Sequence, residues 1–576
     1  MQITGVELFI KALKSESVDT IFAYPGGQVI DLFDRLNSED SIDVILPRHE
    51  QGLIHAADGY ARSTWKVGVC LVTSGPGATN LVTGIATANY DSVPLVCFTG
   101  QVPVKLMGKN SFQEVDIVSI TKSICKYAVT VKKREDLGEI IKKAFSIARS
   151  GRPGVVVVDL PKDIQISLGN DYYSNESNDI TFKPDYSQIN RAIELLKNAK
   201  RPILLIGGGV KIAGAYKEIT KFAEDTGIPV VTTIMGKGAI STNNPLYIGN
   251  LGIHGSYAAN TSISECDVLF AIGVRFNDRI TGNVNEFAKN TKIIHVDIDP
   301  TVISKNILAE VEIVGDAKKI INLFIDRVPK IDCYRWREEI YSWKEKYPLG
   351  LLQKNSSMLT PYAIINEINK NFDNAIITTD VGQNQLWTTQ FLELDSNKQM
   401  LTSGGLGTMG YGLPAAIGSK IGNMNKDVIT ICGDGGFQMN LQELATAMVY
   451  ELPIIICIFN NGYLGNVRQW QEMFFDKRYS NTCLRYRKSC PKICNSPTEK
   501  CPSIIPDFIK LAESYGAKAI RVTKLEDIKK ALLEGKNEKN VPTVIKFMIE
   551  REENVLPIVP PGNSLENMIM EQSNNL

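Results

Sequence analysis

One acidic residue and a pair of asparagines stand where two predicted parallel strands end. The turn Gly433-Asp434-Gly435-Gly436 follows the apolar stretch Val428 to Cys432, and Asn460-Asn461 follows the next apolar stretch, Ile454 to Phe459. A strand–helix–strand unit places such residues at the carboxyl edge of a parallel sheet, where open α/β sheets hold ligands. One carboxylate and one amide oxygen suit Mg²⁺, which binds few protein groups together with phosphate oxygens. Glycines at a helix N-terminus let the backbone approach a diphosphate. We therefore predict a metal and diphosphate site here.

The same unit occurs earlier in the chain, without gaps, at an offset of 359 residues. Gly77 matches Gly436 and Pro94 matches Pro453, and both copies contain Ala-Thr-Ala. Both copies are typical of right-handed βαβ units. Chance similarity between two ordinary units is the alternative, but the shared Ala-Thr-Ala and proline favour duplicated domains. The first copy lacks the aspartate and the asparagine pair, so we do not expect it to hold the metal.

A third α/β pattern lies between the two copies. The strand Arg201 to Ile206 enters the glycine turn Gly207-Gly208-Gly209, and two later strands end at Gly273 and Asp299. A glycine turn followed by an acidic strand end is typical of nucleotide binding, but this is no GxGxxG, so an ordinary α/β turn fits equally well. The predicted fold class is α/β, with three doubly wound parallel-sheet domains of which the first and third are related by duplication. The expected domains are residues 1–165, 188–330 and 358–550, followed by a tail at 551–576.

Bulk composition narrows the class of protein. The 576 residues suggest about three domains. The formal net charge is zero, which gives no sign of a nucleic-acid or membrane-surface partner. No run reaches the roughly 18 apolar residues of a membrane span, and the start Met1 to Gly5 has no signal-peptide pattern. We therefore expect the protein to work where it is made, in the cytoplasm of a bacterium or in a plastid (chloroplast) stroma.

The Gly433–Asn461 spacing resembles the thiamine-diphosphate motif. Further stretches that match one enzyme family run along the chain in order: Tyr24-Pro25-Gly26-Gly27, Arg48-His49-Glu50-Gln51-Gly52, Phe112-Gln113-Glu114, Gly151-Arg152-Pro153-Gly154, Asp380-Val381-Gly382-Gln383, Gly405-Leu406-Gly407-Thr408-Met409-Gly410, Val467-Arg468-Gln469-Trp470 and Leu556 to Gly562. Through these stretches, nearly the whole chain resembles the catalytic subunits of acetohydroxyacid synthases, also called acetolactate synthases, a family of thiamine-diphosphate flavoenzymes.

The resemblance implies a reaction and an assembly. Two pyruvates would be joined with loss of CO₂ to give 2-acetolactate, and pyruvate with 2-oxobutyrate would give 2-aceto-2-hydroxybutyrate, in branched-chain amino-acid synthesis. The implied cofactors are thiamine diphosphate, Mg²⁺ and FAD. Active sites would form in a homodimer or higher oligomer, with the pyrimidine-binding domain of one subunit facing the diphosphate-binding domain of another. A small regulatory subunit is a further possible partner.

The resemblance also assigns residues to the cofactor. Glu50 would hydrogen-bond the pyrimidine N1′, so that the 4′-amine can take the C2 proton; the alternative is a glutamate that only caps a helix. Asp434, Asn461 and the backbone carbonyl of Tyr463 would bind Mg²⁺, although an aspartate there can also cap a helix. The residues expected around thiamine diphosphate are Glu50, Gly382, Gln383, Gly407, Met409, Gly433, Asp434, Gly435, Gly436 and Asn461.

Two more groups follow from the matched positions. Arg152, His254, Arg275, His295, Asp297 and Asp299 would bind FAD, although Asn277 stands before Asp278 where the family has two aspartates. Phe112, Gln113 and Lys162 would line the substrate channel, and Trp470 would shape the acceptor pocket. Trp470 can instead be half of a core aromatic pair, Met409 a core filler, Lys162 a solvated lysine and Arg152 a turn residue.

Residues 481–505 depart from the family pattern. They contain Cys483, Cys490, Cys494 and Cys501, with spacings unlike common zinc sites, and five basic residues. A surface insertion is the first interpretation, with metal binding or a redox-sensitive or partner-binding loop as alternatives.

For the whole chain, the competing hypotheses are a related flavoenzyme such as pyruvate oxidase, and a non-catalytic paralogue that serves as a binding partner. The acceptor preference and valine feedback cannot be predicted from these motifs.

Overall fold

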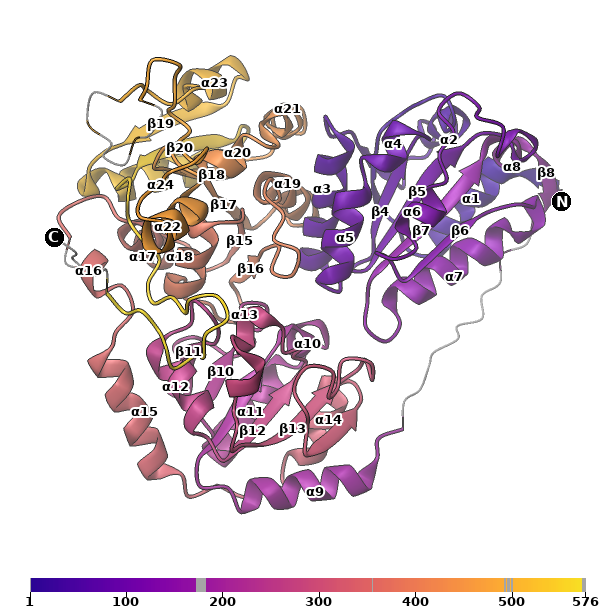
Figure 1. Ribbon diagram of the computed structural model, residues 1–576. Helices are drawn as coiled ribbons and strands as arrows, with labels where there is room; N and C mark the ends of the chain where they lie inside the picture. The colour runs from indigo at the N-terminus through magenta and orange to yellow at the C-terminus, as the bar shows by residue number, and fades with distance from the viewer. Residues whose placement is uncertain are drawn as a thin grey trace.

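Three parallel sheets organise the chain. The computed structural model describes residues 2–171, 173, 183–354, 356–491, 494, 498 and 501–571. In this part of the chain, three six-stranded sheets, each flanked by helices, form three domains (Figure 1). Every strand pair within these three sheets is parallel. The predicted fold class is thereby confirmed.

The first domain has the strand order β3-β2-β4-β5-β7-β6. Its strands are β2 (Thr20–Ala23), β3 (Asp43–Ile45), β4 (Gly68–Val72), β5 (Leu95–Gln101), β6 (Tyr127–Thr130) and β7 (Val155–Pro161). Its helices are α1 (Gly5–Ser15), α2 (Ile30–Leu36), α3 (Glu50–Thr64), α4 (Pro76–Thr79), α5 (Val82–Tyr90), α6 (Ile117–Thr121), α7 (Leu137–Arg149) and α8 (Lys162–Ile166). The short strands β1 (Gln2–Thr4) and β8 (Leu168–Asn170) pair antiparallel beside the main sheet, so this unit extends to Asn170.

The third domain repeats that topology. Its strands are β15 (Ala375–Thr379), β16 (Gln399–Leu401), β17 (Asp427–Gly433), β18 (Ile454–Asn460), β19 (Lys518–Val522) and β20 (Thr543–Met548), in the order β16-β15-β17-β18-β20-β19. Counted along each domain, both orders are second, first, third, fourth, sixth, fifth. The bounds of β5 and β18 also coincide at the offset of 359 residues. This shared topology supports a duplication.

Helices of the third domain flank its sheet on both faces. They are α16 (Leu351–Lys354), α17 (Pro361–Asn371), α18 (Gln383–Phe391), α19 (Gly412–Gly422), α20 (Asp434–Phe437), α21 (Leu444–Val449), α22 (Gly465–Phe474), α23 (Phe508–Ser514) and α24 (Ile528–Asn537), with the 3₁₀ turn η4 (Leu441–Glu443) before α21. One core, which includes Trp387 and Phe547, lies on one side of the sheet, and another, which includes Ile456 and Phe508, lies on the other.

The middle domain has the strand order β11-β10-β9-β12-β13-β14. Its strands are β9 (Pro202–Ile206), β10 (Val230–Thr232), β11 (Tyr247–Asn250), β12 (Val268–Ile272), β13 (Lys292–Asp297) and β14 (Val311–Val314). Its helices are α9 (Tyr186–Lys197), α10 (Gly208–Ile212), α11 (Tyr216–Thr226), α12 (Tyr257–Glu265), α13 (Asp278–Thr281), α14 (Ala317–Phe324) and α15 (Tyr334–Lys346). Counted along the domain, the order is 3-2-1-4-5-6, which dinucleotide-binding domains use.

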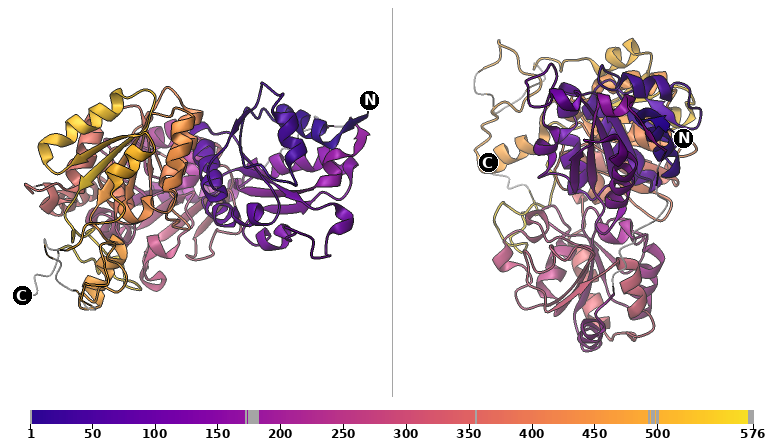
Figure 2. Two further views of the ribbon diagram at one scale, coloured as in Figure 1. Left: turned by 90° about the horizontal axis from the view of Figure 1, so that it is seen from above. Right: turned by 90° about the vertical axis from the view of Figure 1, so that its right-hand side faces the viewer.

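The first and third domains lie side by side and meet through α3 and α19 (Figures 1 and 2). The two helix backbones approach so closely that only glycine fits at the crossing. A Cβ added to Gly59 would lie 2.1 Å from the carbonyl oxygen of Ala415, and one added to Gly418 would lie 1.7 Å from that of Ala56. This interface fixes the position of Glu50, the first residue of α3, relative to the third domain.

The C-terminal tail crosses from the third domain to the middle domain. The backbone N–H of Val555 donates to Gln469 on α22 at 2.9 Å, and that of Val559 donates to the carbonyl of Ile253 at 2.8 Å. The part of the tail beyond residue 571 lies outside the described residues. Within the described part of the chain, no helix combines the length and the apolar character needed to cross a bilayer.

Candidate functional site

Asp434 lies buried at the carboxyl end of β17, and half of its carboxylate has no protein partner. One oxygen, Oδ2, accepts a hydrogen bond from the backbone N–H of Gly462 at 2.6 Å and another from the side-chain amide of Asn460. The other oxygen, Oδ1, is buried without a partner, as is the amide oxygen of Asn460. Buried polar atoms normally have partners. Two orphaned oxygens on side chains that contact each other therefore fit a bound cation.

The electrostatics of this turn agree with that interpretation. Burial raises the pKa of Asp434 to about 6, although the donors Gly462 and Asn460 act in the opposite direction. A nearby cation favours the ionised form of a carboxylate. Asn461, predicted as the second ligand, accepts from the backbone N–H of Tyr463 at 3.0 Å and donates to Gln383 at 3.4 Å. Asn460 contacts Asp434 directly, a role that the sequence analysis did not give it.

A small cavity opens beside Asp434 and is lined by the third domain. Its lining includes most of the residues predicted to bind thiamine diphosphate or Mg²⁺ in this domain: Gly382, Gln383, Met409, Gly433, Asp434, Gly435, Gly436, Asn461 and Tyr463. An added Cβ at Gly382 or Gly433 would have only the amide oxygen of Asn384 within 4 Å, so these glycines leave space that protein atoms do not fill. A backbone exposed to a cavity beside a helix N-terminus suits a diphosphate.

Glu50 lies in the first domain, at the corresponding edge of that sheet. His49 caps α3 by accepting from the backbone N–H of Gln51 at 3.1 Å, which places Glu50 in the first turn. The Glu50 carboxylate accepts a hydrogen bond from the side-chain amide of Asn80 at 2.9 Å. A Cβ on Gly77 would lie 3.5 Å from it. Glu50 therefore faces the glycine turn that matches the Asp434 turn in the other copy.

The three predicted channel residues of the first domain lie at this edge or next to it. Gln113 packs against Gly75 and has a positive φ of 59°. Lys162 donates to the carbonyl of Gly27 at 2.9 Å and is also 3.4 Å from Asp31. Phe112 is 86% exposed, a large fraction for a phenylalanine. Neither Glu50 nor any of these three residues lines the small cavity or the larger cavity described next.

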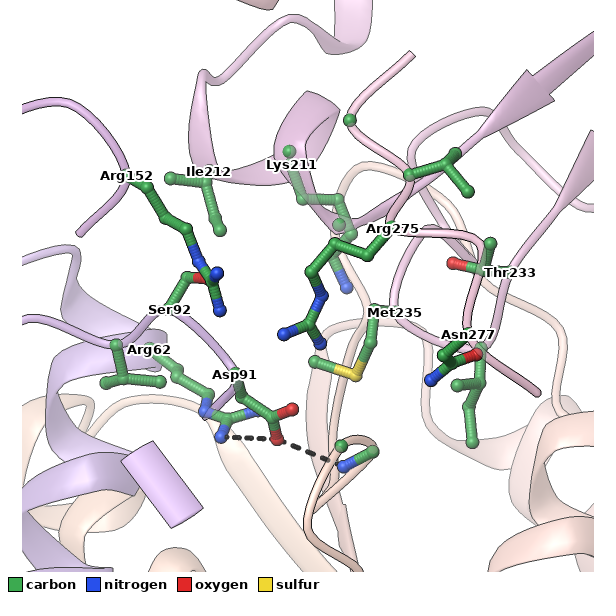
Figure 3. Close-up of a pocket in the computed structure, with 18 of the residues that line it drawn as sticks. Arg62, Asp91, Ser92, Arg152, Lys211, Ile212, Thr233, Met235, Arg275 and Asn277 are labelled. Atoms are coloured by element: carbon green, nitrogen blue, oxygen red, sulfur yellow. Dashed lines mark hydrogen bonds and ion pairs between the residues drawn. The ribbon is translucent and has the colours of Figure 1, made fainter. Parts of the chain in front are cut away.

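A larger cavity of about 1220 Å³ lies where the three domains meet (Figure 3). It opens at the carboxyl ends of β9 and β12, where the strand order of the middle sheet reverses and such sheets bind dinucleotides. Of the residues predicted to bind FAD, Arg152, His254, Arg275 and Asp297 line it. Figure 3 shows the guanidinium groups of Arg152 and Arg275 pointing into the cavity from two domains.

The other two predicted FAD residues lie beside this cavity. His295 is buried, and its Nε2 is 2.8 Å from the carbonyl oxygen of Val274. Asp299 is 3.7 Å from Arg152 and bonds Thr301. Asn277, where the family pattern has an aspartate, is in the lining, and its side-chain oxygen is buried without a protein partner.

The two cavities share part of their lining. Gly382 and Asn466 line both, whereas Trp470 and Gly407 line the larger one. The indole N–H of Trp470 has no protein partner. The Met409 side chain lies beside Gly435, where a Cβ would be 3.7 Å from its methyl group. Trp470, the predicted acceptor-pocket residue, lies about one helical turn along α22 from Asn466.

The start of the cysteine-containing segment packs on the metal turn. The backbone N–H of Leu464 donates to Thr482 at 2.8 Å, and that of Leu484 donates to Gly462 at 2.9 Å. No group of three or more His, Cys, Asp or Glu side chains among the described residues could hold a metal ion. Residues 492, 493, 495–497, 499 and 500 of this segment lie outside the described residues.

Comparison with known families agrees with the fold and the site. The thiamine pyrophosphate enzyme N-terminal TPP-binding domain matches residues 3–120, the central domain matches 189–324, and the C-terminal TPP-binding domain matches 380–547. Three such domains, with Asp434 in the third, define the class: this is a thiamine pyrophosphate enzyme.

Individual relatives narrow the class. A probable acetolactate synthase large subunit of Methanocaldococcus jannaschii is 44% identical, over 98% of this chain and 95% of the relative. The acetolactate synthase large subunit of Cyanidium caldarium is 44% identical over 98% and 96%, and that of Corynebacterium glutamicum is 42% identical over 98% and 89%. The chain belongs to the acetolactate synthase large-subunit family.

Proposed function

We propose that this chain catalyses the decarboxylative condensation of pyruvate with a second pyruvate or with 2-oxobutyrate, as a thiamine-diphosphate-dependent acetolactate synthase. The observation that carries the proposal is the buried Asp434 carboxylate, half unpartnered, beside a cavity that glycine backbone leaves open. Full-length similarity to acetolactate synthase large subunits supports the choice of reaction. This reaction is the first common step of valine, leucine and isoleucine synthesis.

The third domain supplies the cofactor-binding residues of the proposal. Asp434, Asn461 and the Tyr463 carbonyl would hold Mg²⁺, with the Asn460 oxygen as a further candidate because it is buried without a partner. When bound, thiamine diphosphate supplies a carbon that adds to the oxoacid carbonyl and takes up the electron pair released with CO₂. Gly382 and Gly433 let the backbone approach the diphosphate, and Met409 supports the cofactor from the Gly435 side.

Glu50 is proposed to hold a proton at the pyrimidine N1′ of a cofactor bound to a second copy of the chain. Two observations support a shared site. The small cavity is lined by third-domain residues alone, and Glu50 lines neither cavity. In a homodimer, the Glu50 edge of one chain would face the Asp434 edge of the other, and the exposed Phe112 would be covered there together with Gln113 and Lys162.

The larger cavity is proposed to bind FAD. Its position at the reversal of a 3-2-1-4-5-6 sheet and its arginines, Arg152 and Arg275, suit the diphosphate of a dinucleotide. Trp470 lines this cavity about one helical turn from Asn466, which lines both cavities, and we assign it to the pocket for the second oxoacid. Its flat apolar face would pack against the extra methylene of 2-oxobutyrate.

A product assay tests the proposal. The purified protein is supplied with pyruvate, with and without 2-oxobutyrate, together with thiamine diphosphate, Mg²⁺ and FAD. We expect both acetohydroxyacids to form without oxygen uptake. Oxygen consumption with acetyl phosphate or peroxide formation would favour the alternative, a pyruvate oxidase. CO₂ release without a condensed product would indicate a simple decarboxylase.

Two further proposals concern the cellular compartment of the protein and a partner subunit. We propose that the chain acts in the compartment where it is made, a bacterial cytoplasm or a plastid stroma. A small regulatory subunit is also proposed, and co-purification from the native source, followed by a valine titration with and without the added subunit, tests it.

A further inference from the structure

A carboxylate of the third domain holds the backbone turn that carries Glu50. Glu443, at the end of η4, is 1% exposed. Its Oε1 accepts hydrogen bonds from the backbone N–H groups of Arg48 and His49, both at 3.1 Å. Its Oε2 lies 3.1 Å from the same Arg48 nitrogen and accepts the hydroxyl of Thr446 at 2.6 Å. Both carboxylate oxygens are therefore used, and the two backbone donors belong to the residues just before Glu50.

The carboxylate also contacts the first turn of α3. A Cβ added to Gly52 would lie 2.4 Å from Oε1 of Glu443, so the helix backbone passes directly over it. A negative charge at this end of a 15-residue helix is favourable, because backbone N–H groups of the first turn point toward it. Glu443 thus contacts both the Arg48–His49 backbone that leads into α3 and the first turn of that helix.

The contacts of Glu50 itself are fewer. Asn80 bonds one carboxylate oxygen, and His49 caps the helix through Gln51. The other third-domain contact of this segment lies further back, where the hydroxyl of Tyr450 accepts from the backbone N–H of Leu46 at 2.8 Å. The orientation of the Glu50 side chain therefore depends on the backbone of Arg48 and His49, whose N–H groups donate to Glu443.

We propose that Glu443 is a positioning residue for Glu50: its carboxylate fixes the Arg48–His49 turn so that Glu50 meets the cofactor in the correct direction. This rests on the proposed function, in which Glu50 acts on the pyrimidine ring. Glu443 lines neither cavity. It acts through the backbone, and misplacing a catalytic group by about 1 Å can cost about 100-fold in rate.

The experiment measures the step that Glu50 serves. The C2 hydrogen–deuterium exchange of bound thiamine diphosphate is followed by quenched-flow NMR in the Mg²⁺- and FAD-loaded enzyme, together with kcat, KM and cofactor affinity. For Glu443→Gln we expect exchange and kcat to fall by the same factor, about 10–100-fold, with KM for pyruvate and the affinity for thiamine diphosphate nearly unchanged. Exchange at the wild-type rate in the folded, cofactor-loaded Glu443→Gln variant overturns the proposal.

Further variants separate positioning from stability. Tyr450→Phe removes a neighbouring contact across the same interface and should leave exchange unchanged. Glu50→Gln combined with Glu443→Gln should be no slower than Glu50→Gln alone, because both changes act on one step; an additional loss contradicts the assignment. If Glu443→Gln does not fold, Glu443→Asp and Thr446→Val replace it, and both should slow exchange by a smaller factor.

Measurements on the wild type distinguish a failure of the Glu443 assignment from a failure of the proposed function. If it forms acetohydroxyacids while Glu443→Gln exchanges at the normal rate, only the role of Glu443 fails. If the wild type neither exchanges the C2 proton nor forms product, the proposed function fails as well.

Discussion

Asp91 of the first domain accepts a hydrogen bond at 3.0 Å from the backbone N–H of Gly404 in the third domain (Figure 3). The same oxygen also contacts Arg62 at 3.0 Å, and Arg62 in turn pairs with Asp58 at 2.7 Å. Asp91 is 6% exposed, so this charge is buried between domains. It ties the loop that carries Gly407 and Met409 to the first domain.

Replacing Asp91 is expected to loosen that loop. In Asp91→Asn, Arg62 keeps its contacts with Asp58 and the Thr402 carbonyl, and the loop loses a charge-assisted acceptor worth about 2 kcal/mol. We expect the thermal midpoint to fall by about 4–8 °C and the affinity for thiamine diphosphate to weaken. Calorimetry and fluorescence titration measure the two effects. The exposed Asp40→Asn is the matched control; an equal effect in that variant would contradict a specific role for Asp91.

Asp434→Asn is expected to weaken Mg²⁺-dependent cofactor binding. The substitution removes the charge of the buried carboxylate while nearly keeping its shape. We expect the affinity for thiamine diphosphate in Mg²⁺ to fall by at least about 100-fold, and excess EDTA to reproduce the loss in the wild type. Isothermal titration with and without Mg²⁺ checks this. Asp373→Asn, an exposed change in the same domain, should bind normally, whereas tight Mg²⁺-dependent binding by Asp434→Asn would remove Asp434 from the metal site.

A mixing experiment tests whether the site is shared between chains. Glu50→Gln should retain the affinity for the cofactor and Mg²⁺ but nearly abolish condensation, and Asp434→Asn should also be inactive. After the two are mixed and reassociated, half of the dimers contain both chains and one intact site, so about one quarter of wild-type activity should return. If Glu50 instead served the cofactor of its own chain, the mixture would stay inactive.

Trp470 is expected to control the choice of the second oxoacid. Trp470→Leu removes the flat surface that we assign to the extra methylene of 2-oxobutyrate. The preference for 2-oxobutyrate over pyruvate should fall by about 10-fold, with the rate of acetolactate formation less affected. Competition assays with both acceptors measure this ratio. Trp343→Phe, on the distant helix α15, is the control, and an unchanged product ratio in Trp470→Leu would place the acceptor pocket elsewhere.

The raised pKa of the buried Asp159 carboxyl should make the free energy of unfolding depend on pH. Burial raises the pKa of this carboxyl to about 6, against the opposing effect of hydrogen bonds from Thr99, Gln101 and Thr130. The folded state therefore binds the proton more tightly than the unfolded state. The resulting stabilisation is complete below about pH 4 and is lost as the pH rises through about 6.

Asp159→Asn removes that contribution and keeps one acceptor oxygen. Relative to the wild type, its thermal midpoint should be lower at pH 5 than at pH 7.5. Comparing the difference at each pH cancels the opposite trend from buried histidines such as His55, whose pKa burial lowers to about 3. A difference that does not change with pH would show that Asp159 is ionised throughout.

Local motifs predicted that Asp434 and Asn461 stand at the ends of neighbouring parallel strands, and β17 and β18 do pair with each other. The two copies of the repeat could also be recognised, since β5 and β18 keep the same bounds at a fixed offset. The order of the middle strands could not be predicted, because no local pattern specifies which strands become neighbours. The first domain was expected to end at residue 165. In the structure β8, which ends at Asn170, still pairs with β1 of that domain.

The residues that sequence reasoning missed act over long sequence separations. Glu443 holds a turn about 400 positions away, and Asp91 holds a loop more than 300 positions away. Nothing in the segment Leu441 to Thr446 indicates that its glutamate faces another domain. Asn460 was visible as half of a pair, but its contact with Asp434 depends on the geometry of the strand ends.

Glu443 belongs to the same short stretch of chain that begins at Asp434 and passes through α20. In the proposed dimer, Asp434 serves one cofactor while the Glu50 turn held by Glu443 serves the other. A diphosphate bound beside α20 in one centre would therefore be linked, through this stretch of chain, to the acid–base group of the second centre. We expect thiamine diphosphate to bind the dimer cooperatively, the first molecule easing the second.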